Sequence, residues 1–195
     1  MKKLIMILCL TLIGPIGTVQ AMERETLVGS GEDVDHGGFG GVTLKGGKMA
    51  GDYQVMVGGK GAWLIDHQLY AGGSGYGVTR SLNINDDEYQ VGLGGFMIGY
   101  YFLPSKLVHF GMDVTIGGGG ISETYTSNES SNHHHNGDAV FYAEPTLYAS
   151  LNLASHAKLN AGITYRYVLG SDTAGLSDED LRGFNAEVSI VFGKF

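Results

Sequence analysis

The chain has 195 residues, a formal net charge of −8, 33 glycines and a single cysteine. Its length fits one domain with a sizeable core. The acidic balance offers no basic patch for nucleic acid, and one cysteine cannot form a disulfide framework. Glycine is about twice as frequent as in average proteins. It alternates with aromatic and aliphatic residues, which excludes a collagen repeat and a flexible linker.

The N-terminus has the pattern of a secretory signal peptide. A short basic start precedes an apolar run over residues 4–17, and Val19 and Ala21 stand at the −3 and −1 positions of a cleavage site. We therefore expect residues 1–21 to direct export. Residues 22–35 are polar and acidic, and we expect them to form a flexible leader. The remaining chain, residues 36–195, is expected to be a single domain.

Period-two alternation of apolar and polar residues predicts a series of long β-strands in this domain. Strands of soluble proteins typically have about 5–6 residues. A tilted strand that crosses a bilayer needs about 9–11. The expected strands are longer than typical strands of soluble proteins and long enough to cross a bilayer. They span residues 36–48, 52–65, 68–81, 89–102, 107–118, 139–153, 158–169 and 182–195.

The alternation is clearest over residues 139–169, which read as a hairpin with one apolar and one polar face. The apolar set of its first arm is Ala139, Phe141, Ala143, Pro145, Leu147, Ala149, Leu151 and Leu153. Pro145 lacks a backbone donor, and we expect a local bulge there. In the second strand, Tyr53 and Trp63 stand at the two ends of the apolar face, as at the interfaces of an outer-membrane barrel.

The connections between strands alternate in length. They are short at 66–67, 103–106 and 154–157, and they are long, polar and acidic at 82–88, 123–137 and 171–181. Up-and-down outer-membrane barrels have short periplasmic turns and longer external loops. The short link at 49–51 is an exception. The sequence therefore predicts an all-β fold, a closed eight-stranded antiparallel up-and-down transmembrane barrel with both ends on the periplasmic side.

In such a barrel the apolar set faces lipid and the other set faces the lumen. Eight strands leave an interior that side chains can fill, so we expect no wide pore. The lumen-facing polar candidates for a binding role are Lys60, His109, Asp113, Glu144, Arg166 and Glu187. We expect ion pairs such as Glu144–Arg166 on neighbouring strands, and His109 with Asp113 as a structural pair. The glycines would make room for large aromatic side chains.

The final strand leaves the direction of its last residue open. Phe184, Ala186, Val188, Ile190 and Phe192 share one face, but Phe195 falls on the other. A bulge at Gly193 would return Phe195 to the apolar face. Without a bulge, the terminal side chain points elsewhere.

Over nearly all of the expected mature chain, the sequence resembles small eight-stranded outer-membrane barrel proteins. It is also similar to an uncharacterised family of exported bacterial proteins. The matching stretches are GGFGG (37–41), GGKGAWLIDH (58–67), GGSGYG (72–77), LVHF with GGGG (107–120), GLSDEDLRG (175–183) and the ending FGKF. The resemblance implies a fold and an outer-membrane location. It carries over no catalytic or binding residue.

Three local motifs suggest chemistry, and each has a simpler interpretation. Residues 41–46 resemble the start of a phosphate loop, but Gly47 stands where a lysine is needed. The adjacent residues His133–His135 could bind a metal, yet a loop gives them no fixed geometry. Residues 175–183 lack the spaced ligands of a calcium loop and favour a capped turn. We therefore predict no catalytic residue, metal or cofactor.

These observations predict a non-enzymatic protein in the outer membrane of a Gram-negative bacterium. We expect a monomer in contact with outer-membrane lipid, acting in envelope structure or in surface interaction through its external loops with an unidentified extracellular or periplasmic partner. One alternative is binding or passage of a small apolar molecule within the barrel. Another is a soluble periplasmic barrel that binds a ligand, in which the apolar face points inward and Lys60, Glu144 and Arg166 point outward.

Overall fold

The computed structural model describes the backbone of residues 34–80, 82–84, 87–124, 137–170 and 177–195. The expected signal peptide, nearly all of the leader and the histidine run at 133–135 lie outside these residues. In the described part the strands are β1 (His36–Met49), β2 (Asp52–Ile65), β3 (Leu69–Val78), β4 (Leu82–Ile84), β5 (Asp87–Phe102), β6 (Val108–Thr124), β7 (Gly137–Ala154), β8 (Ala157–Leu169) and β9 (Gly183–Lys194). One short helix, α2, spans Asp178–Leu181.

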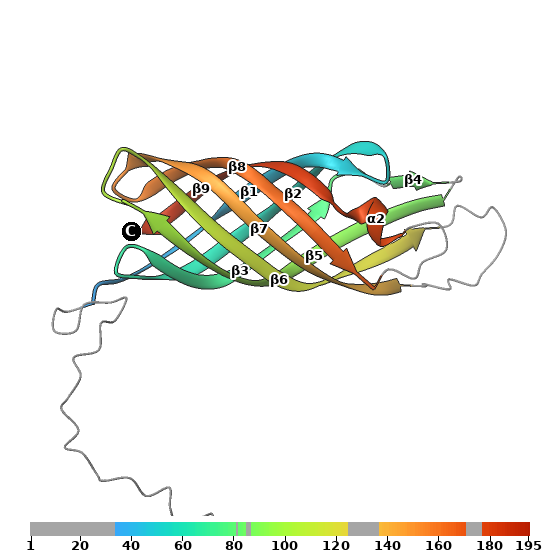
Figure 1. Ribbon diagram of the computed structural model, residues 1–195, viewed down its shortest axis with the longest axis horizontal. Helices are drawn as coiled ribbons and strands as arrows, with labels where there is room; N and C mark the ends of the chain where they lie inside the picture. The colour runs from blue at the N-terminus through green and yellow to red at the C-terminus, as the bar shows by residue number, and fades with distance from the viewer. Residues whose placement is uncertain (1–33, 81, 85–86, 125–136, 171–176) are drawn as a thin grey trace, which may run out of the picture. The chain divides into compact units, whose positions relative to one another are not determined.

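The strands form a closed antiparallel barrel (Figure 1). Their order is β3-β2-β1-β9-β8-β7-β6-β5-β4, and β3 also pairs with β5. β3 and the three-residue β4 occupy successive positions beside β5, so the barrel has eight strand positions. The predicted eight-stranded up-and-down barrel is confirmed. The predicted loop at 82–88 is wrong, because β4 and the start of β5 extend the hairpin through it.

The two ends of the barrel differ as the sequence predicts. One end, here called the turn end, carries the connections at 66–68, 103–107 and 155–156 and both ends of the barrel domain (Figure 1). Asp66 and His67 there have φ values of 51° and 57°, and positive φ at both central residues is what a type I′ hairpin turn requires. The other end, the loop end, carries α2 and β4.

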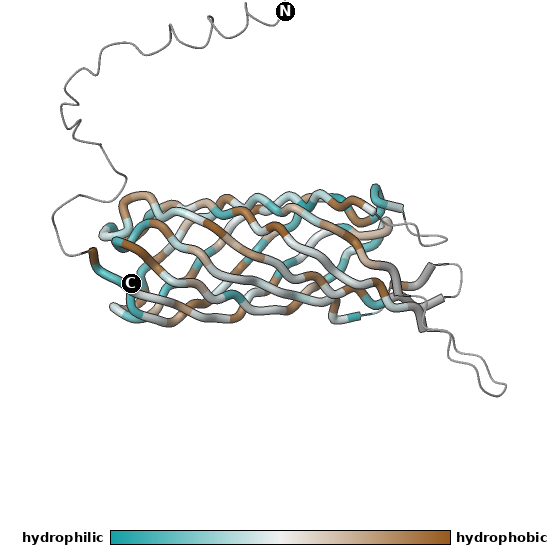
Figure 2. The backbone as a smooth tube through the Cα atoms, turned by 90° about the horizontal axis from the view of Figure 1, so that it is seen from below, coloured by the Kyte–Doolittle hydropathy of each residue, from teal (hydrophilic) through white to brown (hydrophobic). Residues whose placement is uncertain are grey.

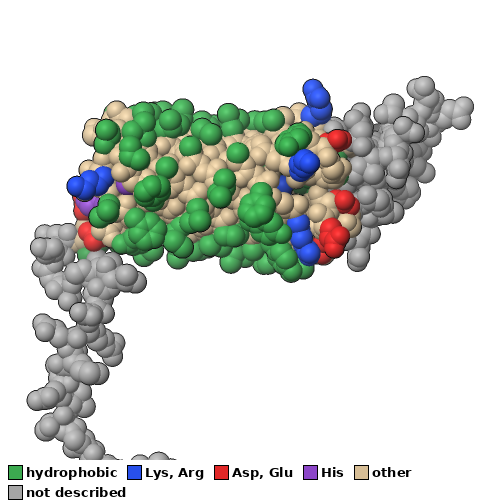
Figure 3. Space-filling view, turned by 45° about the horizontal axis from the view of Figure 1, so that its top comes forward, with side chains coloured by type: hydrophobic (Ala, Val, Ile, Leu, Met, Phe, Trp, Pro, Cys, Tyr) green, Lys and Arg blue, Asp and Glu red, His purple; other side chains and the backbone are tan. Residues whose placement is uncertain are grey.

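The side chains alternate between the exterior and the interior as predicted. In β7, the odd-numbered residues Phe141 and Leu147 are exposed. The even-numbered residues Tyr142, Glu144 and Tyr148 are buried. In Figure 2, hydrophobic and hydrophilic residues follow one another closely along the strands. Apolar side chains cover the barrel wall and charged ones gather at its ends (Figure 3). The exposed apolar residues include Leu44, Val55, Val57, Phe96, Ile98, Phe110, Ile116, Ile163, Val188 and Ile190.

The expected bulge at Pro145 is absent, and the register also decides the alternative left open at Gly193. The register of β7 against β8 is the same on both sides of Pro145, with Ala143 opposite Tyr167 and Thr146 opposite Thr164. The pairing lapses there without a bulge, and the register shifts instead between Asn152 and Ala154. The register of β9 against β1 is likewise constant through Gly193.

Because Gly193 forms no bulge, Phe195 keeps the inward parity. Its ring stacks on Phe39, with ring centroids 5.8 Å apart, and it packs against the buried aromatic cluster at the turn end. The terminal side chain therefore helps to close the barrel mouth and does not face lipid.

Inward-facing glycines make room inside the barrel. A Cβ on Gly99 would lie 2.2 Å from Cζ of Tyr70, and one on Gly111 would lie 2.4 Å from Cζ of Tyr148. Both tyrosines are buried in the lumen. The expectation that glycines accommodate large aromatic side chains is confirmed for these two positions.

Neighbouring glycines of β5 provide a test of this packing. A Cβ on the inward Gly95 would lie 2.4 Å from the backbone oxygen of Ile116, whereas one on the outward Gly94 would lie 3.6 Å from that of Ser74, an ordinary contact. We predict that Gly95→Ala destabilises the barrel by roughly 1–3 kcal/mol, as overpacking does. Gly94→Ala should change stability by less than about 0.5 kcal/mol.

Urea unfolding in lipid vesicles, followed by the mobility of unheated samples on a gel, measures both values. Equal unfolding midpoints for the two variants would contradict the assignment of Gly95 to the interior.

Candidate functional site

The structure places all six lumen-facing candidates inside the barrel. Each is buried, and they come from five strands: Lys60 from β2, His109 and Asp113 from β6, Glu144 from β7, Arg166 from β8, and Glu187 from β9. Their lumenal position follows from the period-two alternation that also turns the apolar set outward. Any binding role for them remains a prediction.

The centre of the lumen contains a continuous line of alternating charges. Nζ of Lys45 lies 2.9 Å from Oε2 of Glu144 and 3.4 Å from Oε2 of Glu187. Nζ of Lys60 lies 2.7 Å from Oε1 of Glu187 and 3.9 Å from Oδ2 of Asp113. Glu187 thus bridges two ammonium groups. A buried charge is tolerated only with such partners, so these five side chains stabilise the interior as one unit.

Tyrosine hydroxyls complete the network at both ends. Tyr76 donates a hydrogen bond to Glu144, and the Lys45 ammonium lies 4.0 Å from the centroid of the Tyr76 ring. Tyr70 donates to Asp113 over 3.0 Å, and its hydroxyl lies 2.8 Å from that of Tyr148. Each tyrosine therefore shares a carboxylate oxygen with a lysine, Oε2 of Glu144 and Oδ2 of Asp113. Among the described residues, Oε1 of Glu144 is buried without a hydrogen-bond partner.

Two expected pairs are not formed. Glu144 bonds to Lys45 and not to Arg166, which donates to the backbone oxygen of Leu181 at 2.9 Å. Arg166 also donates to Sδ of Met56 and to Oδ1 of Asn185. These partners lie farther toward the loop end than Glu144 does. The guanidinium of Arg166 therefore points toward the loop end and away from Glu144.

His109 and Asp113 also use separate partners. Nδ1 of His109 lies 3.2 Å from the backbone oxygen of Lys106, and its ring packs edge-on against Tyr101. Asp113 instead faces Lys60 and Tyr70. Four residues of extended strand hold the two side chains too far apart for the expected pair.

Apolar layers enclose the charged centre. Toward the loop end, eleven buried residues that include Met56, Tyr142 and Leu181 form one cluster. Toward the turn end, Phe39, Tyr70, Tyr101 and Tyr148 belong to another. The cavity beside Lys45, Lys60 and Glu187 measures only about 10 Å³, about the size of a single water. Side chains therefore fill the middle of the barrel, which opposes passage of an apolar molecule.

The helix α2 covers the loop end as a capped turn, as the sequence favours. The Ser177 hydroxyl accepts a hydrogen bond from the backbone N–H of Asp180, and the Asp180 carboxylate accepts one from the backbone N–H of Ser177. This reciprocal arrangement is a capping box. It holds Leu181 in the apolar cluster and its carbonyl against Arg166.

At the turn end, charged residues tie the start of β1 to its neighbours. Lys194 donates to the Asp35 carboxylate and, over 3.0 Å, to the backbone oxygen of His36. The hydrogen bond from Lys194 holds the pKa of Asp35 below its ordinary value. Nε2 of His67 lies 3.5 Å from the same carboxylate.

Sequence reasoning missed Lys45 and Lys158 as lumenal charges. Lys45 shares parity with Thr43 and alternates with Val42 and Leu44. The glycines on either side of this stretch have no side chain to mark a face, so the alternation is too short to be recognised. Lys158 belongs to the polar set of the β7–β8 hairpin, so its parity alone could have identified it.

Within the described residues, no three His, Cys, Asp or Glu side chains are grouped as a metal site. The same part of the chain has no helix that is long and apolar enough to cross a membrane.

An apolar exterior around a filled, charged interior defines the class of this fold: the small eight-stranded outer-membrane β-barrels. Neisserial surface protein A matches with a TM-score of 0.60 at 11% identity, over 84% of this chain and 100% of that one. The N-terminal β-barrel domain of Pseudomonas aeruginosa OprF matches at 0.54 and 9%, over 83% and 99%.

The attachment invasion locus protein Ail of Yersinia pestis, in complex with the heparin analogue sucrose octasulfate, matches with a TM-score of 0.53 at 10% identity, over 83% of this chain and 99% of that one. At these identities the likeness shows the fold alone. No protein-family model and no curated protein sequence matches the chain. The resemblance to the exported family therefore stays a prediction.

The bridging carboxylate Glu187 gives a test of the lumenal network. We predict that Glu187→Gln destabilises the barrel by about 3 kcal/mol or more, because two buried ammonium groups lose their shared partner. The control Glu179→Gln removes an exposed carboxylate of α2 and should cost less than about 1 kcal/mol.

Adding Lys60→Met to Glu187→Gln should recover part of the loss, because it removes a buried ammonium group that is otherwise left with Asp113 alone, at 3.9 Å. Urea unfolding in vesicles measures these three variants and Lys60→Met alone. If the double variant were less stable than the sum of its single changes, the direct pairing would be contradicted.

Proposed function

We propose that this protein is a non-enzymatic outer-membrane protein, exported by its N-terminal signal, that acts in envelope structure or in surface interaction through the connections at its loop end. The observation that carries this proposal is the separation of apolar side chains on the outside of the barrel from charged side chains on the inside. Exposed aliphatic and aromatic residues surround the barrel wall. The charged residues away from the strand ends point inward, and the exposed strand residues Lys48, Asp52 and Lys194 lie at the ends of their strands. A protein in water would gain nothing from that arrangement, whereas lipid requires it.

The same division opposes the soluble periplasmic alternative. That alternative needs the apolar face inside and Lys60, Glu144 and Arg166 outside, but all three are buried in the barrel. The long connections support a role at the cell surface, since strands and turns of such a barrel leave only the loops free to meet a partner. Membership of the exported family with GGFGG and GLSDxDLxG motifs is part of this proposal.

The negative charge at the loop end argues against proposing a sulfated ligand, such as the one in the Ail complex, for this protein. Three segments at the loop end contain many Asp and Glu residues and no Lys or Arg: residues 82–88, which include β4 and the start of β5, and the connections at 123–137 and 171–181. A sulfated polymer would be repelled by this charge. The proposed partner surface is therefore basic or neutral.

The location can be tested by fractionation and a gel with unheated and boiled samples. The protein should sediment with the outer membrane, resist extraction by mild detergent, and change its gel mobility when boiled, because a closed barrel stays folded in cold detergent. Recovery in the soluble periplasmic fraction would overturn the proposed location.

Deletion of residues 126–135 tests the role of the longest loop. This segment lies between β6, which ends at Thr124, and β7, which begins at Gly137, and Ser122 of β6 pairs with Gly137. We predict that the deleted protein still inserts and shows the same shift on boiling, as loop length contributes little to stability. Loss of insertion would show that the segment is needed for the barrel itself and is not a surface appendage.

A further inference from the structure

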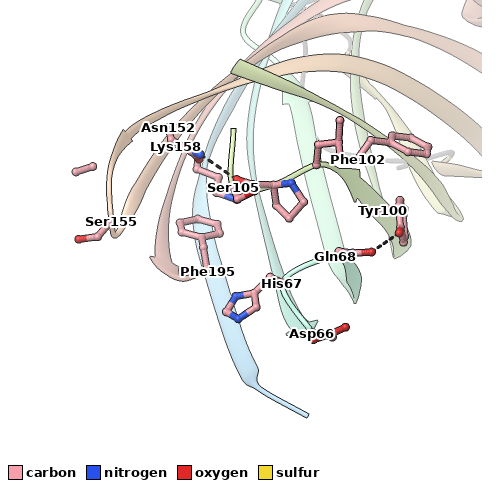
Figure 4. Close-up of a pocket in the computed structure, with 13 residues that line it drawn as sticks. Asp66, His67, Gln68, Tyr100, Phe102, Ser105, Asn152, Ser155, Lys158 and Phe195 are labelled. Atoms are coloured by element: carbon pink, nitrogen blue, oxygen red, sulfur yellow. Dashed lines mark hydrogen bonds between the residues drawn. The ribbon is translucent and has the colours of Figure 1, made fainter. Parts of the chain in front are cut away.

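A cavity of about 840 Å³ lies at the turn end of the barrel (Figure 4). Its volume falls within the range of small-molecule sites, about 300–1,000 Å³. The turns at 66–68 and 103–105, the β7–β8 turn and the terminal Phe195 surround it. It is separated from the charged centre of the lumen by the aromatic cluster that contains Tyr101 and Tyr148.

The lining of this cavity comes from both faces of the barrel wall. Lys158 points to the interior and is 3% exposed. Phe102 belongs to the lipid-facing set of β5 and is 45% exposed, and the neighbouring Leu103 is 69% exposed. A cavity with these walls passes over the rim of the barrel, from the lumen to the apolar exterior. It can accommodate a molecule with a polar end and an apolar end.

Lys158 is the buried cation of this cavity, and it has no acidic partner among the described residues. Its ammonium lies 4.3 Å from the ring centroid of Tyr101 and 4.2 Å from that of Phe195. Rings stabilise a cation only partly, and a buried charge ordinarily has a counter-ion. The contrast with Lys45 and Lys60, each of which has two carboxylates, singles out Lys158.

Most other polar groups around the cavity already have partners. Nδ2 of Asn152 donates to the backbone oxygens of Pro104 and Lys106, and Gln68 accepts from Tyr100. Among the described residues, Oδ1 of Asn152 is a buried acceptor without a hydrogen-bond partner, and an acceptor does not attract an anion. Asp66 brings one carboxylate to the lining, more than 4 Å from Lys158. An anionic group in the cavity would therefore bind next to Lys158 and away from Asp66.

We propose that this cavity binds a glycerophospholipid, with the headgroup phosphate on Lys158 and an acyl chain passing Phe102 and Leu103 into the membrane. Phosphate supplies the missing counter-ion, and a charge-assisted contact to it is among the stronger polar interactions. The apolar rim then continues the acyl environment of the bilayer leaflet on the turn side. This inference rests on the proposed membrane location.

The test uses the full processed protein, purified in dodecyl maltoside and first shown to be folded by its shift on boiling. Short-chain phosphatidylglycerol is titrated calorimetrically, and a diacylglycerol of the same chain length serves as the lipid without phosphate. Phosphatidylglycerol should bind at one site, and Lys158→Met should weaken it about tenfold or more. Lys158→Arg should retain binding. Equal affinity for the diacylglycerol would overturn the proposed phosphate contact.

Two further variants separate this contact from a general effect of charge. Lys194→Met removes an exposed cation from the same end and should leave the affinity unchanged, whereas Asp66→Asn should strengthen binding by removing a like charge. Equal weakening by Lys194→Met and Lys158→Met would overturn the site. Because the titration is carried out in detergent on a folded barrel, its failure is distinguishable from recovery of the protein in the soluble fraction.

Discussion

Closure of the sheet is the constraint on which the other features of this protein depend. An open strand edge in hydrocarbon would leave backbone groups unpaired at several kcal/mol each. β1 and β9, the first and last strands of the domain, pair in constant register from Gly38–Lys194 to Gly47–Asn185, and β3 pairs with β5. With eight strand positions, closure fixes an interior that is only as wide as its side chains. Every inward residue must therefore fit within that width.

The narrow interior explains both the glycines and the charges. A tyrosine ring can lie over the inner face of the neighbouring strand only where that strand has no side chain, as the ring of Tyr70 lies over its paired residue Gly99. A lysine from one wall reaches a carboxylate on another, so Lys45 meets Glu144 and Glu187 directly. The charges neutralise one another along a line, and apolar clusters at both ends keep water from the pairs. Removal of water strengthens these pairs and makes an unpaired member costly.

The parity of the sequence was sufficient to predict eight long strands and the burial of six polar residues. It did not predict β4, and in the glycine-rich β1 it did not reveal that Lys45 faces inward. It could not predict which of those residues meet. Lys45 and Glu144 are 99 positions apart, and their contact depends on the stagger of strands around the barrel. Glu144 and Arg166 share one hairpin, yet their side chains turn toward different partners. The direction of Phe195 was undetermined for a similar reason, because a single bulge would have reversed it.

The filled centre divides the molecule into two ends with different chemistry. At the loop end, α2 is joined to the interior by Leu181, whose side chain enters the apolar cluster and whose carbonyl accepts from the fully buried Arg166. A change in the connection at 171–181 would therefore act on a buried cation as well as on the surface. At the turn end, Lys158 lies beside an open cavity with aromatic rings as its neighbours. The described side chains between the two ends leave almost no space. A ligand bound at one end therefore does not pass through the barrel to the other end.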